Sequence, residues 1–253
     1  MEFKILGPIG ACSSGEEISL HGAKQRTVLA ALLLNRQRLV SDSRLGELLW
    51  GESLPATFSA QIYTYVSRLR KCLGKAVEIV RRPPGYLLHL QNCEFDLLSF
   101  EQMACAGAAS LAAGRYQEAA RTLHRALACW QGPAVANGTE HLIEAEGPAL
   151  EEARMAALQN RIRADLRLGR YAQLVPELTA LVTVDPFREQ LRADLMTVLY
   201  KCDRQADALN VFHEGRRLLR DEMGADPGAT LTRVYHSILD GGLPAGSLTR
   251  AAR

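Results

Sequence analysis

Two prolines and a glycine, Pro83, Pro84 and Gly85, separate the β-type runs VEIV and YLLHL, and they constrain this part of the chain more than any other feature. Proline has no backbone N–H to donate to a neighbouring strand, whereas glycine adopts turn conformations that other residues avoid. The chain therefore turns back on itself here. The pattern predicts a β-hairpin with Arg81 and Arg82 at its tip.

Three amphipathic helices are expected before this hairpin, and two short β-type runs before the helices. The second helix begins at the capping residues Ser41 and Asp42, and the third ends at Gly74, which suits a left-handed terminus. The expected segments are strands at 3–7 and 16–20, a turn-rich stretch at 8–15, and helices at 23–35, 41–50 and 59–73. This order predicts an N-terminal winged helix-turn-helix domain over residues 1–91.

The third expected helix has one apolar and one polar face. At helical spacing the apolar side chains fall on one side, which predicts the face buried in the core. They are Ile62, Val66, Leu69 and Leu73. The opposite side carries Ala60, Thr64, Ser67, Arg68 and Lys71. Small and hydroxyl residues let a helix approach another surface closely, so this side is the candidate binding face.

The basic excess of the chain is concentrated around this helix and the hairpin. Residues 1–91 contain 12 Lys and Arg against 7 Asp and Glu, whereas residues 92–253 contain 18 against 21. Residues 57–82 alone hold six basic residues and one acidic residue. A local cationic patch of this kind is typical of a polyanion site. The alternative is an ordinary solvated helix face beside a loop that happens to carry arginines.

In a winged helix the third helix enters the DNA major groove, which is about 12 Å wide, and the hairpin reaches phosphates or the adjacent minor groove. Cations on both elements then face one duplex. We therefore predict a double-stranded DNA interface made of the polar helix face and the hairpin tip: Thr64, Ser67, Arg68, Arg70, Lys71, Arg81 and Arg82.

From about residue 95 to residue 240 the sequence indicates helices. The stretches AGRYQEAA, LGRYAQLV and CDRQADAL resemble one another, and Gly169 and Asp203 start equivalent turns about 34 residues apart, the period of a tetratricopeptide repeat. The larger spacing from Gly114 to Gly169 predicts an insertion within residues 130–148. Stacked helices of this kind form either a self-contained core or a concave partner surface.

The predicted fold is mainly α with small β elements. A winged helix-turn-helix at residues 1–91 is followed by an all-helical, tetratricopeptide-like domain at residues 95–240, and residues 241–253 are expected to form a flexible tail. The boundary near residues 91–96 predicts that the two parts are separable in function.

Several function classes lack their sequence signals. No apolar run reaches the roughly 18 residues of a membrane span, and the N-terminus does not resemble a signal peptide, so a cytoplasmic protein without membrane contact is expected. The cysteines are scattered without metal-ligand spacing, and phosphate-loop, dinucleotide-binding, nucleophile-elbow and HExxH motifs are missing. We therefore expect no metal, no cofactor and no enzymatic activity.

The motifs LGPIG, YVSRLRKCLG, PPGYLLHL and RQADALNVFHEGRRLLRDEMGADPGATL, taken in this order, resemble the Streptomyces antibiotic regulatory protein (SARP) family over about residues 1–240. The resemblance implies an OmpR-like winged helix followed by a bacterial transcriptional activation domain. Members activate biosynthetic gene clusters for secondary metabolites such as antibiotics. They bind direct repeats at promoters and recruit the RNA polymerase holoenzyme, so a nucleoid-associated protein, with a possible homodimer on DNA, is implied.

The resemblance also implies roles for matching residues. Thr64, Arg68 and Lys71 correspond to the exposed face of the recognition helix, and Arg81 and Arg82 to the wing. The loop expected to lie near polymerase contains Trp50, Glu52 and Ser53. Two other functions stay open on the sequence: a helical-repeat adaptor whose winged helix binds protein, and an enzyme without a recognisable motif.

Overall fold

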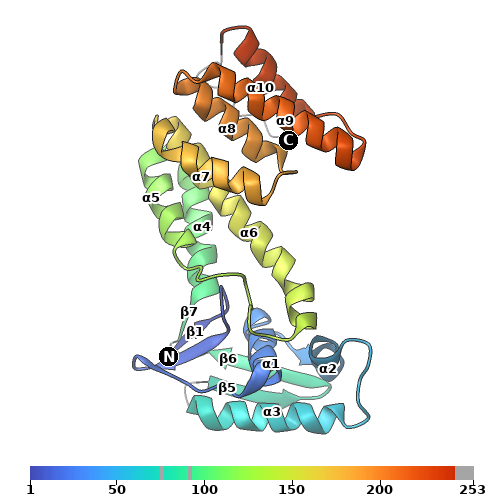
Figure 1. The fold of residues 1–253 in the computed structure, drawn as a ribbon. Coiled ribbons are helices and arrows are strands. Elements are labelled where there is room, and N and C mark those ends of the chain that lie inside the picture. The colour runs from blue at the N-terminus through green and yellow to red at the C-terminus, as the bar shows by residue number, and fades with distance from the viewer. Residues whose placement is uncertain (75–76, 91–92, 243–253) are drawn as a thin grey trace. The chain divides into compact units, whose positions relative to one another are not determined.

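The computed structural model of the chain describes residues 1–74, 77–90 and 93–242, and it is mainly helical with two small sheets (Figure 1). The N-terminal part contains β1 (Glu2–Lys4), β2 (Gly10–Ser13), β3 (Glu16–Glu17), α1 (Gly22–Leu34), β4 (Val40–Ser41), α2 (Asp42–Trp50), α3 (Phe58–Leu73), β5 (Val77–Arg82) and β6 (Gly85–Leu90). The remainder contains β7 (Glu94–Phe95), α4 (Asp96–Ala112), α5 (Tyr116–Leu127), α6 (Glu140–Arg167), α7 (Tyr171–Val184), α8 (Glu189–Lys201), α9 (Gln205–Met223) and α10 (Ala229–Leu239). The predicted winged helix and helical array are both confirmed.

The N-terminal sheet has the strand order β3-β2-β1-β7, in which β1 pairs antiparallel with β2 and parallel with β7. β2 lies within residues 8–15, where only a turn was expected. The tight turn is confined to Ser14 and Gly15, whose φ angles are 52° and 84°. The prediction was wrong for β2 because its hydrogen bonds come from β1, and a run of small residues carries little strand preference of its own.

The second sheet has the order β4-β6-β5 and contains the predicted hairpin. Arg82 pairs with Gly85 at the end of the β5–β6 ladder, so the two prolines occupy the tip. On the other edge of β6, Val40 pairs with Tyr86 and Ser41 with Gly85. The start of α2 is thereby fixed beside the hairpin.

The three helices of the winged domain form close to their predicted ranges, but α1 is buried on all sides from Thr27 to Leu33 and is not amphipathic as expected. The Ser41 hydroxyl caps α2 by accepting a hydrogen bond from the Arg44 backbone N–H at 3.1 Å. The whole predicted apolar stripe of α3 is buried: Ile62, Val66, Leu69 and Leu73. Because α3 buries this stripe against α1, α2 and β5, its opposite face is left to solvent.

The predicted repeat turns between helices share one backbone conformation. Gly114, Gly169 and Asp203 have φ angles of 75°, 72° and 58°, and each stands between two helices. This left-handed conformation ends one helix and reverses the chain into the next. The insertion expected within residues 130–148 is only partly a loop. Residues 128–139 form the α5–α6 loop, and the rest of the insertion belongs to α6, which begins at Glu140.

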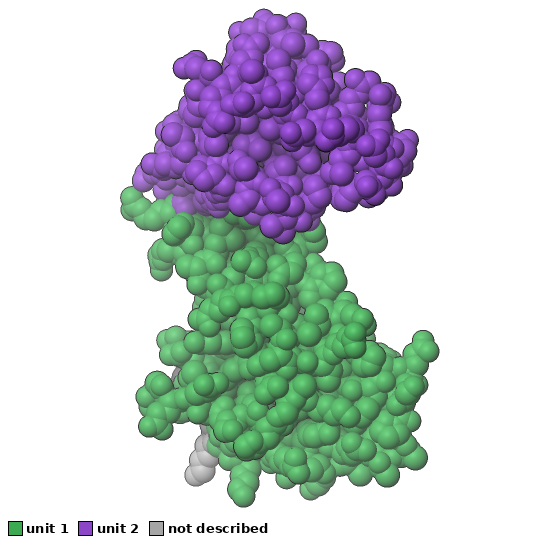
Figure 2. Space-filling model, viewed as in Figure 1, with its two compact units in different colours: residues 1–113, 121–160 green, residues 114–120, 161–253 purple. Residues whose placement is uncertain are grey.

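The described chain divides into two compact units, coloured green and purple in Figure 2. The first consists of Met1–Ala113 with Arg121–Asn160, and the second of Gly114–Ala120 with the chain from Arg161 onward. This division differs from the expected boundary at residues 91–95, since α4, most of α5 and the first part of α6 pack with the winged helix. Of the predicted tail, residues 243–253 lie outside the described residues.

The α5–α6 loop accounts for this difference, because it hydrogen-bonds to the segment that follows β1. The backbone N–H groups of Gln131, Val135 and Ala136 donate to the carbonyls of Leu6, Ile5 and Gly7 at 2.7, 2.9 and 3.1 Å. Further along the loop, the side chain of Asn137 accepts from the Ile9 N–H at 2.8 Å. The segment after β1 therefore has its backbone partners in a loop more than a hundred residues away.

Asp96, at the start of α4, makes a second connection to the same segment. One carboxylate oxygen accepts the backbone N–H groups of Ile5 and Leu6, both at 2.9 Å, and the other accepts that of Leu97 at 2.7 Å. Burial raises the pKa of Asp96, and these donors act in the opposite direction. Asp96 thus joins α4 to the N-terminal segment within the first unit.

The second unit contains a buried polar cluster and a separate buried acid on α8. Asp165 pairs with Arg161 at 3.1 Å and with Arg170 at 2.8 Å. Asp194 on α8 is fully buried; its Oδ1 accepts a hydrogen bond from Gln190 at 2.9 Å, and its Oδ2 has no partner among the described residues. Desolvation by burial raises the pKa of Asp194 to about 6.

We predict that Asp194 makes stability depend on pH. An unfolded aspartate titrates near pH ~3.9, so between roughly pH 4 and 6 the folded chain holds a proton that the unfolded chain has released, and rising pH favours unfolding. Relative to Asp194→Asn, the free energy of unfolding of the wild type should fall by up to about 3 kcal/mol across this window. Urea titrations of both proteins at intervals across it measure the difference. Parallel pH profiles would contradict the prediction.

No helix in the described part of the chain is both long and apolar enough to cross a membrane.

Candidate nucleic-acid interface

The exposed face of α3 carries the predicted contact residues. Thr64, Ser67, Arg68 and Lys71 are all exposed. The Thr64 hydroxyl donates to the Ala60 carbonyl at 2.9 Å, which leaves its oxygen available as an acceptor. Neutral small and hydroxyl groups thus occupy the first turns of this face, and the two cations follow toward the C-terminal end of the helix.

Three of the predicted cations are unengaged. Arg68 and Lys71 on α3 and Arg82 at the end of β5 are exposed, and their side chains make no hydrogen bond or ion pair with the residues that the structure describes. An exposed guanidinium or ammonium without an internal partner keeps all its donors for an anionic ligand. Together these three side chains form what we call the cationic face of the first unit.

Arg70 is placed differently from the expectation that grouped it with the exposed cations. Its Nε and Nη2 both donate to the backbone carbonyl of Ile79, at 2.9 and 2.6 Å. The side chain is half-buried between α3 and β5. Because two hydrogen bonds to one carbonyl restrict the orientation of the guanidinium, Arg70 holds the last turns of α3 against β5 of the hairpin.

Arg81 is exposed but is also paired within the chain. Its Nη1 and Nη2 donate to the two carboxylate oxygens of Asp42, each at 2.6 Å, and its guanidinium lies 4.6 Å from the ring centroid of Tyr86. The hydrogen bond with Asp42 is the largest cause of the raised pKa of Arg81. This bidentate pair joins the hairpin to the first turn of α2. Sequence reasoning missed it because Asp42 and Arg81 are distant along the chain.

Tyr63 is an additional residue of this surface that sequence reasoning passed over. It is 62% exposed, the highest exposure of any large aromatic side chain among the described residues. It stands directly before Thr64 on α3 and outside the buried stripe. Its position outside the apolar spacing was the signal that could have identified it, because tyrosine side chains are enriched at interfaces, where one end is apolar and the other is hydrated.

The loop between α2 and α3 contains the predicted polymerase-facing residues. Glu52 and Ser53 are exposed, whereas Trp50 is half-buried at the end of α2 with the Lys24 ammonium 4.8 Å from its ring centroid. Gly51 follows with a φ of 63°, and a Cβ there would lie 2.7 Å from the His141 ring. The loop is thus fixed at its α2 end and exposed beyond it.

Comparison with known proteins identifies both halves of the chain. Residues 95–239 match the family described as bacterial transcriptional activator domain, and residues 15–88 match the family described as transcriptional regulatory protein, C terminal.

Relatives of known name are similar over nearly the whole chain. Regulatory protein AfsR of Streptomyces griseus is 36% identical and regulatory protein DnrI of Streptomyces peucetius 32% identical, each over 94% of this chain. The chain spans 24% of the AfsR sequence and 92% of DnrI. The solved structure of Mycobacterium tuberculosis EmbR in complex with a low-affinity phosphopeptide matches with a TM-score of 0.89 and 36% identity, over 96% of this chain and 66% of that one.

Proposed function

This chain belongs to the SARP family of transcriptional regulators, and from that premise we propose that it is a sequence-specific DNA-binding activator. In this proposal α3 enters the major groove of a promoter. Tyr63, Thr64 and Ser67 approach the bases, and the cationic face of Arg68, Lys71 and Arg82 contacts phosphates and base edges.

The main support for the proposal is that the basic residues of this surface fall into two groups, one hydrogen-bonded within the chain and one without such partners. Arg70 and Arg81 are held by Ile79 and Asp42, so they set the position of the hairpin relative to α3 and α2. The cations of the cationic face have no such partner among the described residues. Two basic residues thus fix the position of the hairpin, while the others remain free to bind an anion. A surface of fixed geometry with free cations is suited to DNA, whose phosphate charges are regularly spaced.

The finer parts of the function rest on the same premise. We propose that the promoter belongs to an antibiotic or other secondary-metabolite gene cluster and that two copies of the chain occupy direct repeats. We further propose that the α2–α3 loop, with Trp50, Glu52 and Ser53, faces RNA polymerase. No catalytic step is part of this proposal.

The test is promoter binding by Arg68→Ala/Lys71→Ala, measured by gel shift and salt titration on the host's cluster promoters and on random duplex. Each residue that contacts a base edge should cost about 1–3 kcal/mol on the specific site. A residue that contacts only phosphate should weaken binding to all sequences and lower the salt slope by about one.

The matched control is Lys201→Ala/Arg233→Ala, which removes the same charge from exposed positions on α8 and α10. It should bind like the wild type. Equal binding by the α3 variant and the control would exclude α3 as the DNA-contacting helix. A wild-type chain without preference for promoters over random duplex would instead favour the adaptor function.

A further inference from the structure

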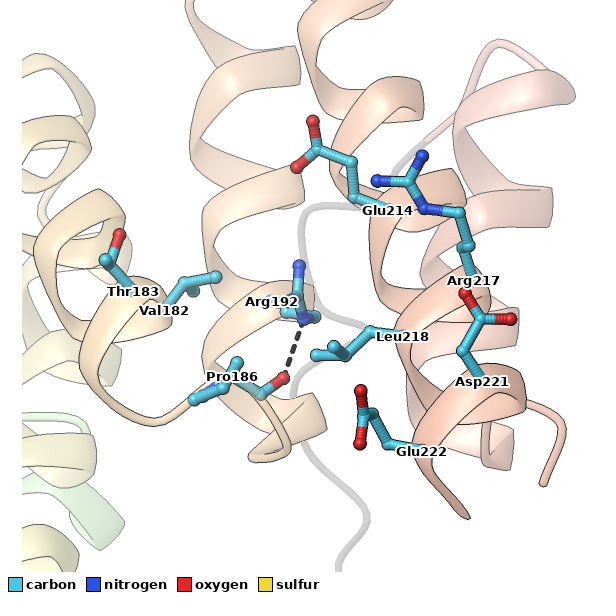
Figure 3. Close-up of a pocket in the computed structure, with 9 residues that line it drawn as sticks. All are labelled: Val182, Thr183, Pro186, Arg192, Glu214, Arg217, Leu218, Asp221 and Glu222. Carbon is cyan, nitrogen blue, oxygen red and sulfur yellow. Dashed lines mark hydrogen bonds between the residues drawn. The ribbon is translucent and has the colours of Figure 1, made fainter. Parts of the chain in front are cut away.

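A pocket of about 470 Å³ lies in the second unit between the end of α7, the start of α8 and α9 (Figure 3). It is partly open to solvent. Its apolar wall comes from Val182, Pro186 and Leu218. This volume is within the range of about 300–1,000 Å³ that small-ligand sites occupy. None of its lining residues belongs to the DNA interface described above.

Arg192 is the buried charge of the pocket, and it is only 6% exposed. Its Nε donates to the Pro186 carbonyl at 2.9 Å, and its Nη1 lies 3.5 Å from the Val211 carbonyl. Within the described residues no carboxylate lies at ion-pair distance from its guanidinium. Desolvation by burial lowers the pKa of Arg192, and the negative charge of Glu214 on α9 acts in the opposite direction without reaching ion-pair distance. A buried guanidinium without an acidic partner is costly to the fold, and an anionic ligand would compensate it.

The sequence of α9 makes room for this side chain. A Cβ on Gly215 would lie 2.9 Å from Arg192 Cδ, so glycine permits the guanidinium to enter between α8 and α9. Glycine inside a helix lowers helix stability by about 1 kcal/mol relative to alanine, so helix stability alone would not favour glycine here. The position is therefore built around Arg192.

The rim of the pocket is acidic. Glu214, Leu218, Asp221 and Glu222 recur at helical spacing along α9, and Figure 3 shows Leu218 directed toward Arg192 with Glu214 and Glu222 on either side of it. The three carboxylates are exposed, as is Arg217 beside them. The pocket thus combines a buried cation, an apolar wall and an exposed rim with an excess of negative charge.

We propose that this pocket binds a small zwitterionic ligand, whose carboxylate pairs with Arg192 and whose ammonium group lies at the carboxylates of α9. A planar guanidinium matches a carboxylate in bidentate geometry. A phosphate dianion is disfavoured, because it would stand opposite three carboxylates. The apolar wall selects ligands that carry apolar side chains in addition to the two charges.

The probe is the dipeptide leucyl-leucine, which has both charges and apolar side chains, titrated calorimetrically into the full chain. N-Acetyl-leucyl-leucine lacks the ammonium group, leucyl-leucinamide lacks the carboxylate, and inorganic phosphate lacks both the cation and the apolar part. We expect the dipeptide to bind and each of the other three to bind at least about tenfold more weakly, since each forfeits a charge-assisted contact.

Two variants locate the site. Arg192→Lys keeps the charge and loses the planar fork, and should weaken dipeptide binding at least about tenfold. Asp221→Asn/Glu222→Gln changes only exposed side chains, so it should fold normally and weaken binding by about three- to tenfold. Asp240→Asn, on an exposed residue after α10, is the control and should bind like the wild type.

The proposal is overturned if the dipeptide shows no heat of binding at millimolar concentration, or if a blocked dipeptide or phosphate binds as tightly as leucyl-leucine. It is also overturned if the Asp221→Asn/Glu222→Gln variant retains full affinity. Because that variant does not alter the buried arginine, the test does not depend on whether Arg192→Lys folds.

Discussion

A fragment of residues 1–91 is expected to lack a cooperative thermal transition and to lose promoter binding, although it contains the entire cationic face. The cut removes β7 from β1, Asp96 from the N–H groups of Ile5 and Leu6, and the α5–α6 loop from the carbonyls that follow β1. Each buried backbone group left without a partner costs about 1–3 kcal/mol, against a total stability of about 5–15 kcal/mol for a domain.

The control is a fragment of residues 1–160, which keeps β7, α4, α5, the loop and the start of α6. It should melt cooperatively and bind the promoter. Circular dichroism melts and amide NMR spectra of both fragments provide the measurement. A well-dispersed spectrum and wild-type promoter affinity for the 1–91 fragment would contradict our division of the chain and restore the boundary expected from the sequence.

Gly85→Ala is expected to separate the hairpin from the rest of the winged domain. A Cβ at this position would lie 2.0 Å from the Val40 carbonyl oxygen and 2.7 Å from Ser41 Cα, both of them backbone atoms of β4. Backbone cannot rotate away as a side chain can, so β4 and β6 must part and the Arg81–Asp42 pair must break with them. We expect a loss of about 4 kcal/mol in the free energy of unfolding, at the upper end for a single substitution.

Gly10→Ala provides the comparison, since it is also a strand glycine but its added Cβ would meet its nearest atom only at 4.0 Å. It should change stability little. Urea unfolding gives the stability of both variants, and gel shift gives promoter binding per folded molecule. An unfolding free energy for Gly85→Ala close to that of Gly10→Ala would show that β4 can yield, and that the hairpin does not depend on this contact.

The sequence predicted those parts of the molecule that short-range patterns determine. The apolar stripe of α3, the Ser41 cap of α2, the proline tip of the hairpin and the inter-helix turns at Gly114 and Gly169 all follow from residues within a few positions of one another. Helix periodicity, capping and turn preference act over that range, so one sequence is sufficient to read them. The family resemblance, and with it the order of the two domains, rests on the same local motifs.

Only the tertiary structure decided which cations are free and where the chain divides. Helical spacing places Arg70 nearer the buried stripe of α3 than Arg68, but only the fold brings the Ile79 carbonyl of β5 within reach of the Arg70 guanidinium. Likewise, residues 131–139 look like an insertion in a repeat until they are found hydrogen-bonded to the segment after β1. Both outcomes depend on contacts between residues far apart in the chain. A hydrogen bond to a distant residue leaves no local sequence pattern, because only the fold brings the two groups together.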